Sequence, residues 1–317
     1  MPVNRRLLAK HKTKPPPWPL ARHADGSIDH LGIPDWLQNL PELQQRGIVL
    51  TVCLKPWYVY STPNHFDDVP AYVVKLLHPD TEEGAIYERL GRDPELSKYT
   101  VPFEIIKSTN PHLLVMPHIR CLTLGAPFRA PFSEVMDVFV QVAEAVALLH
   151  DRKIAHLDIC DGNALLARAV EAKFHKGVVP GRIYIIDYHH SRQLQLGPGE
   201  QPAISLPLTQ VPPPLDIEDF DPYAWDAYCL AELWGMLIEC NYSDTPSPPW
   251  VARRIHKWLL GNERGCTGVC RCRPTARRMF QVLTAIRCLC CALEPLQRAM
   301  ECIRTRWDWV TTYLNSG

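Results

Sequence analysis

The chain has 317 residues, of which 46% are hydrophobic and 21% are charged. This composition predicts a globular protein with a sizeable buried core and argues against a disordered chain. The 34 lysine and arginine residues balance 34 aspartate and glutamate residues, so no overall field favours nucleic acid or an acidic membrane as a partner. No apolar run reaches the roughly 18 residues of a membrane span, and no signal-peptide core is evident. We therefore expect an intracellular protein, cytoplasmic or nuclear.

The first 39 residues are predicted to form a basic, proline-rich flexible tail. Residues 1–24 carry six lysine and arginine residues and no acidic residue, and four prolines lie between positions 15 and 19. Such a composition offers little apolar surface for a core. A targeting or docking role for the tail is the alternative to a simple solvated segment.

Short β-rich runs follow the tail, and helical patterns fill the rest of the chain. A helix is expected from Asp80 to Leu90, with an Asp80…Glu83 capping pattern at its start. The remaining periodicities place strands before His118 and long helices after it. This order predicts an α+β fold with a small β-rich lobe over 40–118 and a larger helical lobe over 119–317. The expected strands are 48–52, 57–60, 71–77, 103–106 and 113–116, and the expected helices are 132–150, 224–240, 251–260, 275–291 and 295–314.

One loop carries most of the predicted chemistry. It has the pattern H-x-D-x-x-x-x-N, from His156 through Asp158 to Asn163, and the apolar run 183–186 then ends at Asp187. Phosphoryl transfer from Mg-ATP needs such a set: a carboxylate that orients and deprotonates the attacking hydroxyl, and oxygen ligands for Mg²⁺. Asp158 fits the first role, and Asn163 with Asp187 fits the second. The alternative for each is an ordinary turn, loop or strand-end residue.

With these residues the chain resembles the eukaryotic protein kinase family over about residues 40–289. It looks most like the divergent kinase-like proteins of mushroom-forming fungi. The resemblance implies that Lys75, in the run Val73-Val74-Lys75, contacts the ATP phosphates and that Glu83 pairs with this lysine. Two alternatives remain: Lys75 as a strand lysine that faces solvent, and Glu83 as part of the capping box.

Three further segments resemble the same family. Met116-Pro117-His118-Ile119 falls at the expected hinge, so the resemblance implies that Met116, Pro117 and Ile119 hold the adenine of ATP. The run 221–230 resembles the helix whose aspartate, here Asp226, braces the catalytic-loop backbone. Arg273-Pro274-Thr275-Ala276 resembles the run before the last family helix. Small-molecule phosphotransferases share the H-x-D-x-x-x-x-N loop but lack the last two features, so a protein kinase is preferred over them.

The chain also departs from the family pattern at four places. No G-x-G-x-x-G precedes Lys75, Cys160 replaces the catalytic-loop lysine, His189 replaces the glycine two residues after Asp187, and prolines 212–214 stand where a glutamate is expected. Leu157 replaces the arginine that receives a phosphorylated activation segment. We therefore predict that phosphorylation of Ser205 or Thr209 is not the switch that activates the protein.

The 12 cysteines are scattered through the chain and are expected to be reduced thiols. A zinc site at Cys266, Cys270 and Cys272 is the alternative to thiols that pack in the core, because C-x-x-x-C-x-C is not a recognised zinc pattern. Two of the cysteines at 288, 290 and 291 are expected on a buried helix face.

The sequence thus predicts a protein kinase that transfers the γ-phosphate of ATP, with Mg²⁺, to Ser or Thr hydroxyls of a protein substrate. The competing interpretation is a pseudokinase that acts as a nucleotide-binding or scaffolding module. Neither nucleic acid nor a membrane is an expected partner, and the oligomeric state and the protein substrate stay open.

Overall fold

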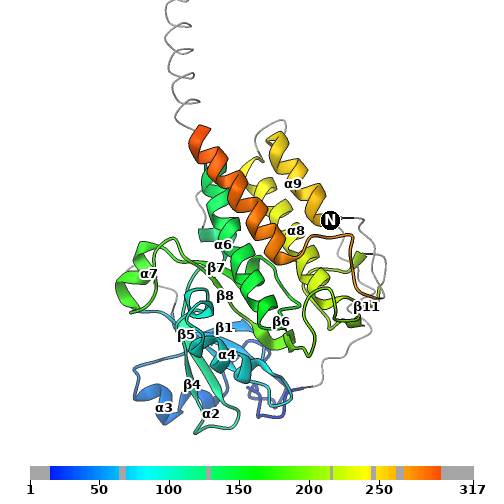
Figure 1. Ribbon diagram of the computed structural model, residues 1–317. Helices are drawn as coiled ribbons and strands as arrows, with labels where there is room; N and C mark the ends of the chain where they lie inside the picture. Colours follow the sequence, from blue (N-terminus) through cyan, green and yellow to red (C-terminus); the bar gives the residue numbers. More distant parts are fainter. Residues whose placement is uncertain are drawn as a thin grey trace, which may run out of the picture. The chain divides into compact units, whose positions relative to one another are not determined.

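The computed structural model describes residues 15–63, 69–125, 130–214, 217–243, 248–261 and 268–293. Internal contacts divide the chain into two units (Figure 1). Unit 1 comprises residues 1–84 and 102–118, and unit 2 comprises residues 85–101 and 119–317. The predicted division also falls after His118, but it assigned 85–101 to the first lobe.

Unit 1 is built on a five-stranded antiparallel sheet with the strand order β1-β2-β3-β5-β4. β3 and β5 are the most buried strands: four of the five residues of β3 and every residue of β5 are buried. The edge strands β1 and β4 carry the exposed positions, since only one of their edges is paired. The strands are β1 (Val52–Lys55), β2 (Val59–Ser61), β3 (Tyr72–Leu76), β4 (Glu104–Ile106) and β5 (Leu113–Pro117).

The predicted flexible tail is wrong for residues 15–39, which pack into unit 1. Trp18 is 6% exposed and Leu37 is fully buried, and both belong to the hydrophobic cluster beneath the sheet. The Trp18 indole N–H donates to the carbonyl of Trp57 at 3.1 Å. The segment is rich in proline and polar residues, but a few large apolar side chains are enough to dock it. Two short helices belong to this region, α2 (Asp35–Gln38) and α3 (Pro41–Gln44).

Unit 2 is mainly helical, and its longest described helices are α6 (Phe132–Asp151) and α8 (Pro222–Asn241). Asp221 caps α8, because its Oδ1 accepts hydrogen bonds from the N–H groups of Tyr223 and Ala224. The helix is buried on nearly all sides, as its continuous apolar sequence predicts. The remaining helices of this unit are α4 (Glu83–Arg92, which begins in unit 1), η1 (Leu96–Lys98), α5 (Leu122–Gly125), η2 (Asp161–Asn163), α7 (Ala169–Phe174), η3 (Tyr188–His190), α9 (Trp250–Leu260) and the described helix 276–293.

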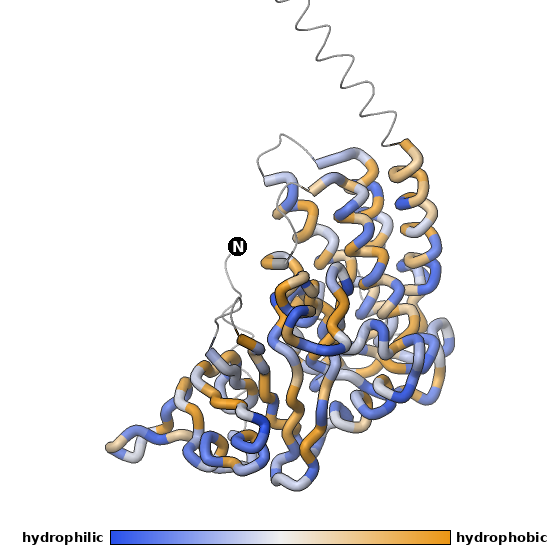
Figure 2. The backbone as a smooth tube through the Cα atoms, turned by 90° about the vertical axis from the view of Figure 1, so that its left-hand side faces the viewer, coloured by the Kyte–Doolittle hydropathy of each residue, from blue (hydrophilic) through white to orange (hydrophobic). Residues whose placement is uncertain are grey.

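Helix 276–293 runs antiparallel to α6 (Figure 1). Arg277, near its start, pairs with Asp151 at the end of α6, and Arg287 pairs with Asp137 near the start of α6. At the far end of helix 276–293 the backbone is coloured hydrophobic (Figure 2), and Leu289 is 64% exposed there. Cys288 and Cys291 are also exposed, so the predicted burial of the late cysteines is wrong. The predicted helix 295–314 lies outside the described residues.

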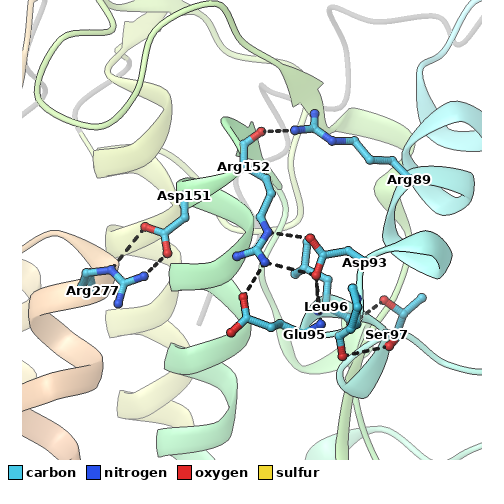
Figure 3. A network of polar contacts seen from close by, with 10 residues as sticks. Arg89, Asp93, Glu95, Leu96, Ser97, Asp151, Arg152 and Arg277 are labelled. Atoms are coloured by element: carbon cyan, nitrogen blue, oxygen red, sulfur yellow. Dashed lines mark hydrogen bonds and ion pairs between the residues drawn. The ribbon is translucent and has the colours of Figure 1, made fainter.

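A polar network joins the end of α6 to the segment after α4 (Figure 3). The Arg152 guanidinium donates to Asp93 through Nε at 2.7 Å and to Glu95 through Nη2 at 2.6 Å. Arg89 donates to the carbonyl of Arg152 at 2.8 Å. The network fixes residues 89–97 to the helical unit, which agrees with their place in unit 2.

Three small two-stranded antiparallel ladders complete the described part of unit 2 and connect its loops. β6 (Ile154–Ala155) pairs with β9 (Arg192–Gln193), and β7 (Ala164–Leu166) pairs with β8 (Ile183–Ile185). β10 (Ile204–Ser205) pairs with β11 (Asp219–Phe220). An isolated bridge joins Thr100 to Ile185. The chain between β7 and β8 contains α7.

None of the helices among the described residues is long and apolar enough to cross a membrane.

Candidate functional site

The loop 156–163 lies between β6 and β7, and α8 holds its backbone. The Asp226 carboxylate accepts the N–H of His156 through Oδ2 at 2.8 Å and the N–H of Leu157 through Oδ1 at 2.7 Å. The Trp225 indole N–H donates to the carbonyl of Leu157 at 2.8 Å. Asp226 is fully buried and Leu157 is 1% exposed. The predicted bracing of the loop by Asp226 is therefore present as direct hydrogen bonds.

His156 links the same loop to the end of β8. Its Nδ1 lies 3.3 Å from the N–H of Asp158, and its Nε2 lies 3.0 Å from the carbonyl of Ile186. A backbone N–H can only donate and a carbonyl can only accept, so these contacts assign the imidazole as the tautomer with hydrogen on Nε2. The ring also lies against Tyr188, with centroids 5.0 Å apart. His156 is thus a structural link between the loop and the end of β8.

Asp158 and Asn163 are buried next to one another in this loop. The Asn163 Nδ2 donates to the carbonyl oxygen of Asp158 at 2.8 Å and to its Oδ2 at 3.1 Å. Both bonds are donated by the nitrogen of the Asn163 carboxamide, so its oxygen points away from Asp158. An amide oxygen held in this way is a ligand of the type that Mg²⁺ prefers.

Asp187 stands at the matching end of the β7–β8 ladder. Ala164 pairs with Ile185, and the N–H of Ile186 donates to the carbonyl of Asn163 at 3.0 Å. Because the two strands are antiparallel, Asn163 before β7 and Asp187 after β8 belong to the same end of the ladder. Asp187 has φ 64° and ψ 63°, a left-handed conformation that is uncommon outside glycine and is concentrated at functional sites. The oxygen groups of Asn163 and Asp187 fit a hard divalent cation.

A residue that the sequence analysis did not identify, Gln210, contacts the Asp158 carboxylate. Its backbone N–H donates to Asp158 Oδ1 at 2.7 Å, and its Nε2 donates to Asp158 Oδ2 at 3.1 Å. Gln210 belongs to the loop that connects β10 with β11. The separation of 52 residues and the absence of any motif around Gln210 gave no sequence signal for this contact.

In unit 1, Lys75 on β3 forms a buried ion pair with Glu83, the first residue of α4. The Lys75 Nζ lies 2.6 Å from Glu83 Oε1, and the two side chains are 3% and 0% exposed. Lys75 therefore does not face solvent. The predicted capping box is not formed either, since α4 begins at Glu83 itself and not near Asp80.

The three residues expected to hold adenine lie at the boundary between the two units in sequence. Met116 and Pro117 end β5, where Val73 pairs with Met116 and Tyr72 pairs with Pro117. Ile119 follows two residues later, and all three are buried. The backbone N–H of His118 donates to the carbonyl of Ala71 at 2.9 Å.

Cys160 supplies no charge beside Asp158. Burial, with the negative charge of Asp158 as the next cause, raises the pKa of the Cys160 thiol to about 12. A thiol with this pKa is neutral near pH 7. The loop therefore has no cation at this position, where the catalytic loop of protein kinases carries a lysine.

The turn between β1 and β2 also departs from a glycine-rich loop. Trp57 occupies it with φ 72°, and its ring lies 5.2 Å from that of His30. A left-handed conformation costs a non-glycine residue of order 1 kcal/mol or more. The ring contact and the hydrogen bond from Trp18 to the Trp57 carbonyl hold the turn in this conformation.

Arg273 is 6% exposed, and its guanidinium lies over two aromatic rings. The distances to the ring centroids are 5.2 Å for Phe220 and 5.4 Å for Tyr228. Glu218 and Asp219, two of the acidic residues that follow the proline run, are exposed. The sulfur atoms of Cys270 and Cys272 lie 4.0 Å and 3.9 Å from Arg273 Nη1.

The structure places no group of three or more potential metal ligands together among the described residues. Cys266, one of the three cysteines considered for zinc, lies outside them. The chain matches no protein-family model, and no curated protein is significantly similar to it.

Proposed function

We propose that this protein is a Mg-ATP-dependent protein kinase with a two-lobed kinase-like fold, and that it phosphorylates Ser or Thr hydroxyls of an intracellular protein. The observation that carries the proposal is the braced loop 156–163. Asp226 holds its backbone, and Asp158 and Asn163 are buried side by side in it. If Asp158 and Asn163 were only turn or capping residues, the loop would not need a buried carboxylate to hold its backbone.

The roles follow from the chemistry of each group. Asp158 orients the substrate hydroxyl and accepts its proton as the oxygen attacks the γ-phosphorus. Asn163 and Asp187 bind Mg²⁺ through oxygen, and the bound ion neutralises charge on the phosphates. Lys75 contacts the α- and β-phosphates, and Glu83 fixes the lysine side chain. Met116, Pro117 and Ile119 are assigned to the adenine.

The direct test is phosphoryl transfer from labelled ATP to a panel of protein substrates. Replacement of the general base in Asp158→Asn should lower the rate on the order of 10²–10⁴-fold. Asp219→Asn is the matched control, because it removes the same charge from an exposed position of unit 2. Equal rates in the wild type and Asp158→Asn would refute the assignment of the base.

A pseudokinase is the second candidate, and two observations favour it. The neutral Cys160 thiol leaves the loop without a cation at the site of developing negative charge. Gln210 occupies both oxygens of Asp158. In this reading the fold serves as a nucleotide-binding or scaffolding module.

Thermal unfolding with and without Mg-ATP separates the candidates further. A ligand that binds the folded state at about 100 times its Kd stabilises the fold by about 2.7 kcal/mol. A melting shift that is lost in Lys75→Met, without phosphoryl transfer to any substrate, would support a nucleotide-binding pseudokinase. No shift at millimolar nucleotide would support a scaffold and contradict the kinase.

A further inference from the structure

Two thiols lie against each other at the beginning of the segment that leads into helix 276–293. The Sγ atoms of Cys270 and Cys272 are 3.2 Å apart. Both residues are partly exposed, so a small oxidant in solution can reach them. A disulfide requires an S–S distance of about 2.05 Å, and the two sulfur atoms are already close to this arrangement.

A cation accompanies the pair. The Arg273 Nη1 lies within 4.0 Å of both sulfur atoms, and the arginine is 6% exposed. The thiolate is the nucleophilic form of cysteine, and a neighbouring arginine is one of the features that favour reactive cysteines. The positive charge therefore stands beside whichever sulfur attacks first.

The backbone of the pair is anchored to a buried element. The N–H of Cys270 donates to Asp221 Oδ2 at 2.9 Å, while Oδ1 of the same carboxylate caps α8. The Arg273 guanidinium is fixed over the rings of Phe220 and Tyr228. The thiols, the cation and the N-terminal end of α8 thus form one packed cluster.

We propose that Cys270 and Cys272 are a peroxide-sensitive dithiol that closes to an intramolecular disulfide. One thiolate attacks a peroxide oxygen and breaks the O–O bond, which gives a sulfenic acid and hydroxide. The second thiolate attacks the sulfenic sulfur, the S–S bond forms and hydroxide leaves. With the two thiol protons, hydrogen peroxide is reduced to two water molecules and the dithiol is oxidised by two electrons.

Arg271 between the two cysteines makes a sharp test possible. The reduced full-length chain is treated with dilute hydrogen peroxide, quenched with an alkylating reagent and digested with trypsin without reduction. Cleavage after Arg271 separates residues 265–271 from residues 272–277, because the bond before Pro274 resists trypsin. We expect these two peptides to be joined after oxidation and released by a reducing agent.

Single variants identify the sulfur atoms involved. Cys266→Ser should keep the link, whereas Cys270→Ser and Cys272→Ser should each abolish it. The exposed Cys288 and Cys291 serve as internal references, and the pair should lose alkylation at lower peroxide concentrations than they do. Arg273→Lys, which keeps the charge, should oxidise faster than Arg273→Gln.

A link that persists in Cys270→Ser but disappears in Cys266→Ser would overturn the proposal. So would oxidation of the pair no earlier than that of Cys288 and Cys291. The readout is independent of phosphoryl transfer, so the outcome does not depend on the proposed kinase activity.

Discussion

Among the described residues of unit 1, Lys75 and Glu83 are the two side chains whose charges are most completely removed from water. A buried ion pair gains little net stability over an apolar pair, but the loss of one partner leaves a buried charge uncompensated. The pair is therefore a sensitive point of the fold, whatever its role toward nucleotide.

We expect Glu83→Gln to lower the free energy of unfolding by about 3–5 kcal/mol. The double variant Lys75→Met with Glu83→Leu should be more stable than Glu83→Gln, because it removes both charges. Denaturant unfolding measures both values. A double variant that is less stable than the single one would show that the charge is compensated by other groups.

At the scale of elements, α8 is a rigid support for the loop 156–163. Asp226 on this helix accepts hydrogen bonds from two backbone N–H groups of the loop, and its Oδ2 also lies 2.9 Å from Nε2 of His150 on α6. One carboxylate thus joins two helices and the candidate catalytic loop.

Asp226→Asn should lower the free energy of unfolding by about 2–3 kcal/mol, because the amide nitrogen faces a buried donor. Glu239→Gln is the control, since Glu239 is exposed on the same helix and its replacement should change stability by less than about 0.5 kcal/mol. Equal stability of the two variants in denaturant unfolding would contradict the supporting role of Asp226.

The network at the end of α6 predicts a dependence of stability on pH. Burial raises the pKa of Asp93, but hydrogen bonds from Arg152 and from the N–H groups of Leu96 and Glu95 outweigh it, so the pKa is lowered overall from 3.8. A carboxyl group whose pKa is lower in the folded state stabilises the fold above its unfolded pKa. This contribution is lost as the pH falls through the lower, folded value.

Asp93→Asn should therefore be less stable than the wild type at neutral pH, by about 1 kcal/mol. The difference should shrink as the pH falls below about 4. Unfolding in denaturant over a pH series measures it. Glu88→Gln removes a carboxylate that pairs with Arg92, a residue whose side chain is 78% exposed, and should show no such convergence. A constant Asp93→Asn difference down to strongly acidic pH would contradict the assignment.

For the whole molecule, the folded part of the chain begins well before the predicted lobe boundary at residue 40. Leu37→Ala should lower the free energy of unfolding by about 2–5 kcal/mol, because Leu37 is fully buried. Leu31→Ala is the matched control at a residue that is 70% exposed, and it should change stability by less than about 0.5 kcal/mol. Equal effects of the two variants would restore the interpretation of 1–39 as a tail.

Local patterns predicted the long elements well and the short ones poorly. The predicted ends of α6, from its periodicity, and of α8, from its continuous apolar sequence, lie within two residues of the observed ends. The strand expected at 48–52 lies instead at Val52–Lys55, because Ile48 and Leu50 pack into the core without joining the sheet. Apolar content alone does not distinguish a residue buried in a sheet strand from one buried in a loop that packs on the core.

The sequence predicted those residues of the candidate site that belong to a recognisable motif. Asp158 and Asn163 belong to one loop, and the pairing of β7 with β8 brings Asp187 to the end of the ladder where Asn163 lies. Gln210 reaches Asp158 through tertiary folding, which no local pattern encodes. The role of Glu83 was open in the sequence because the capping pattern and the ion pair use the same carboxylate.

The contact between Gln210 and Asp158 has a kinetic consequence for the proposed enzyme. Both oxygens of Asp158, the proposed general base, accept hydrogen bonds from Gln210 in the loop between β10 and β11. An incoming hydroxyl would have to exchange with these donors. The substrate and Gln210 would then compete for the Asp158 carboxylate, so that substrate binding requires displacement of the loop. A polypeptide substrate can present amide N–H groups next to its hydroxyl, and these would replace the hydrogen bonds that Gln210 gives up. A small alcohol has no such donors. The selectivity for a polypeptide over a free hydroxyl compound would thus arise at the base itself, before any distant docking contact is made.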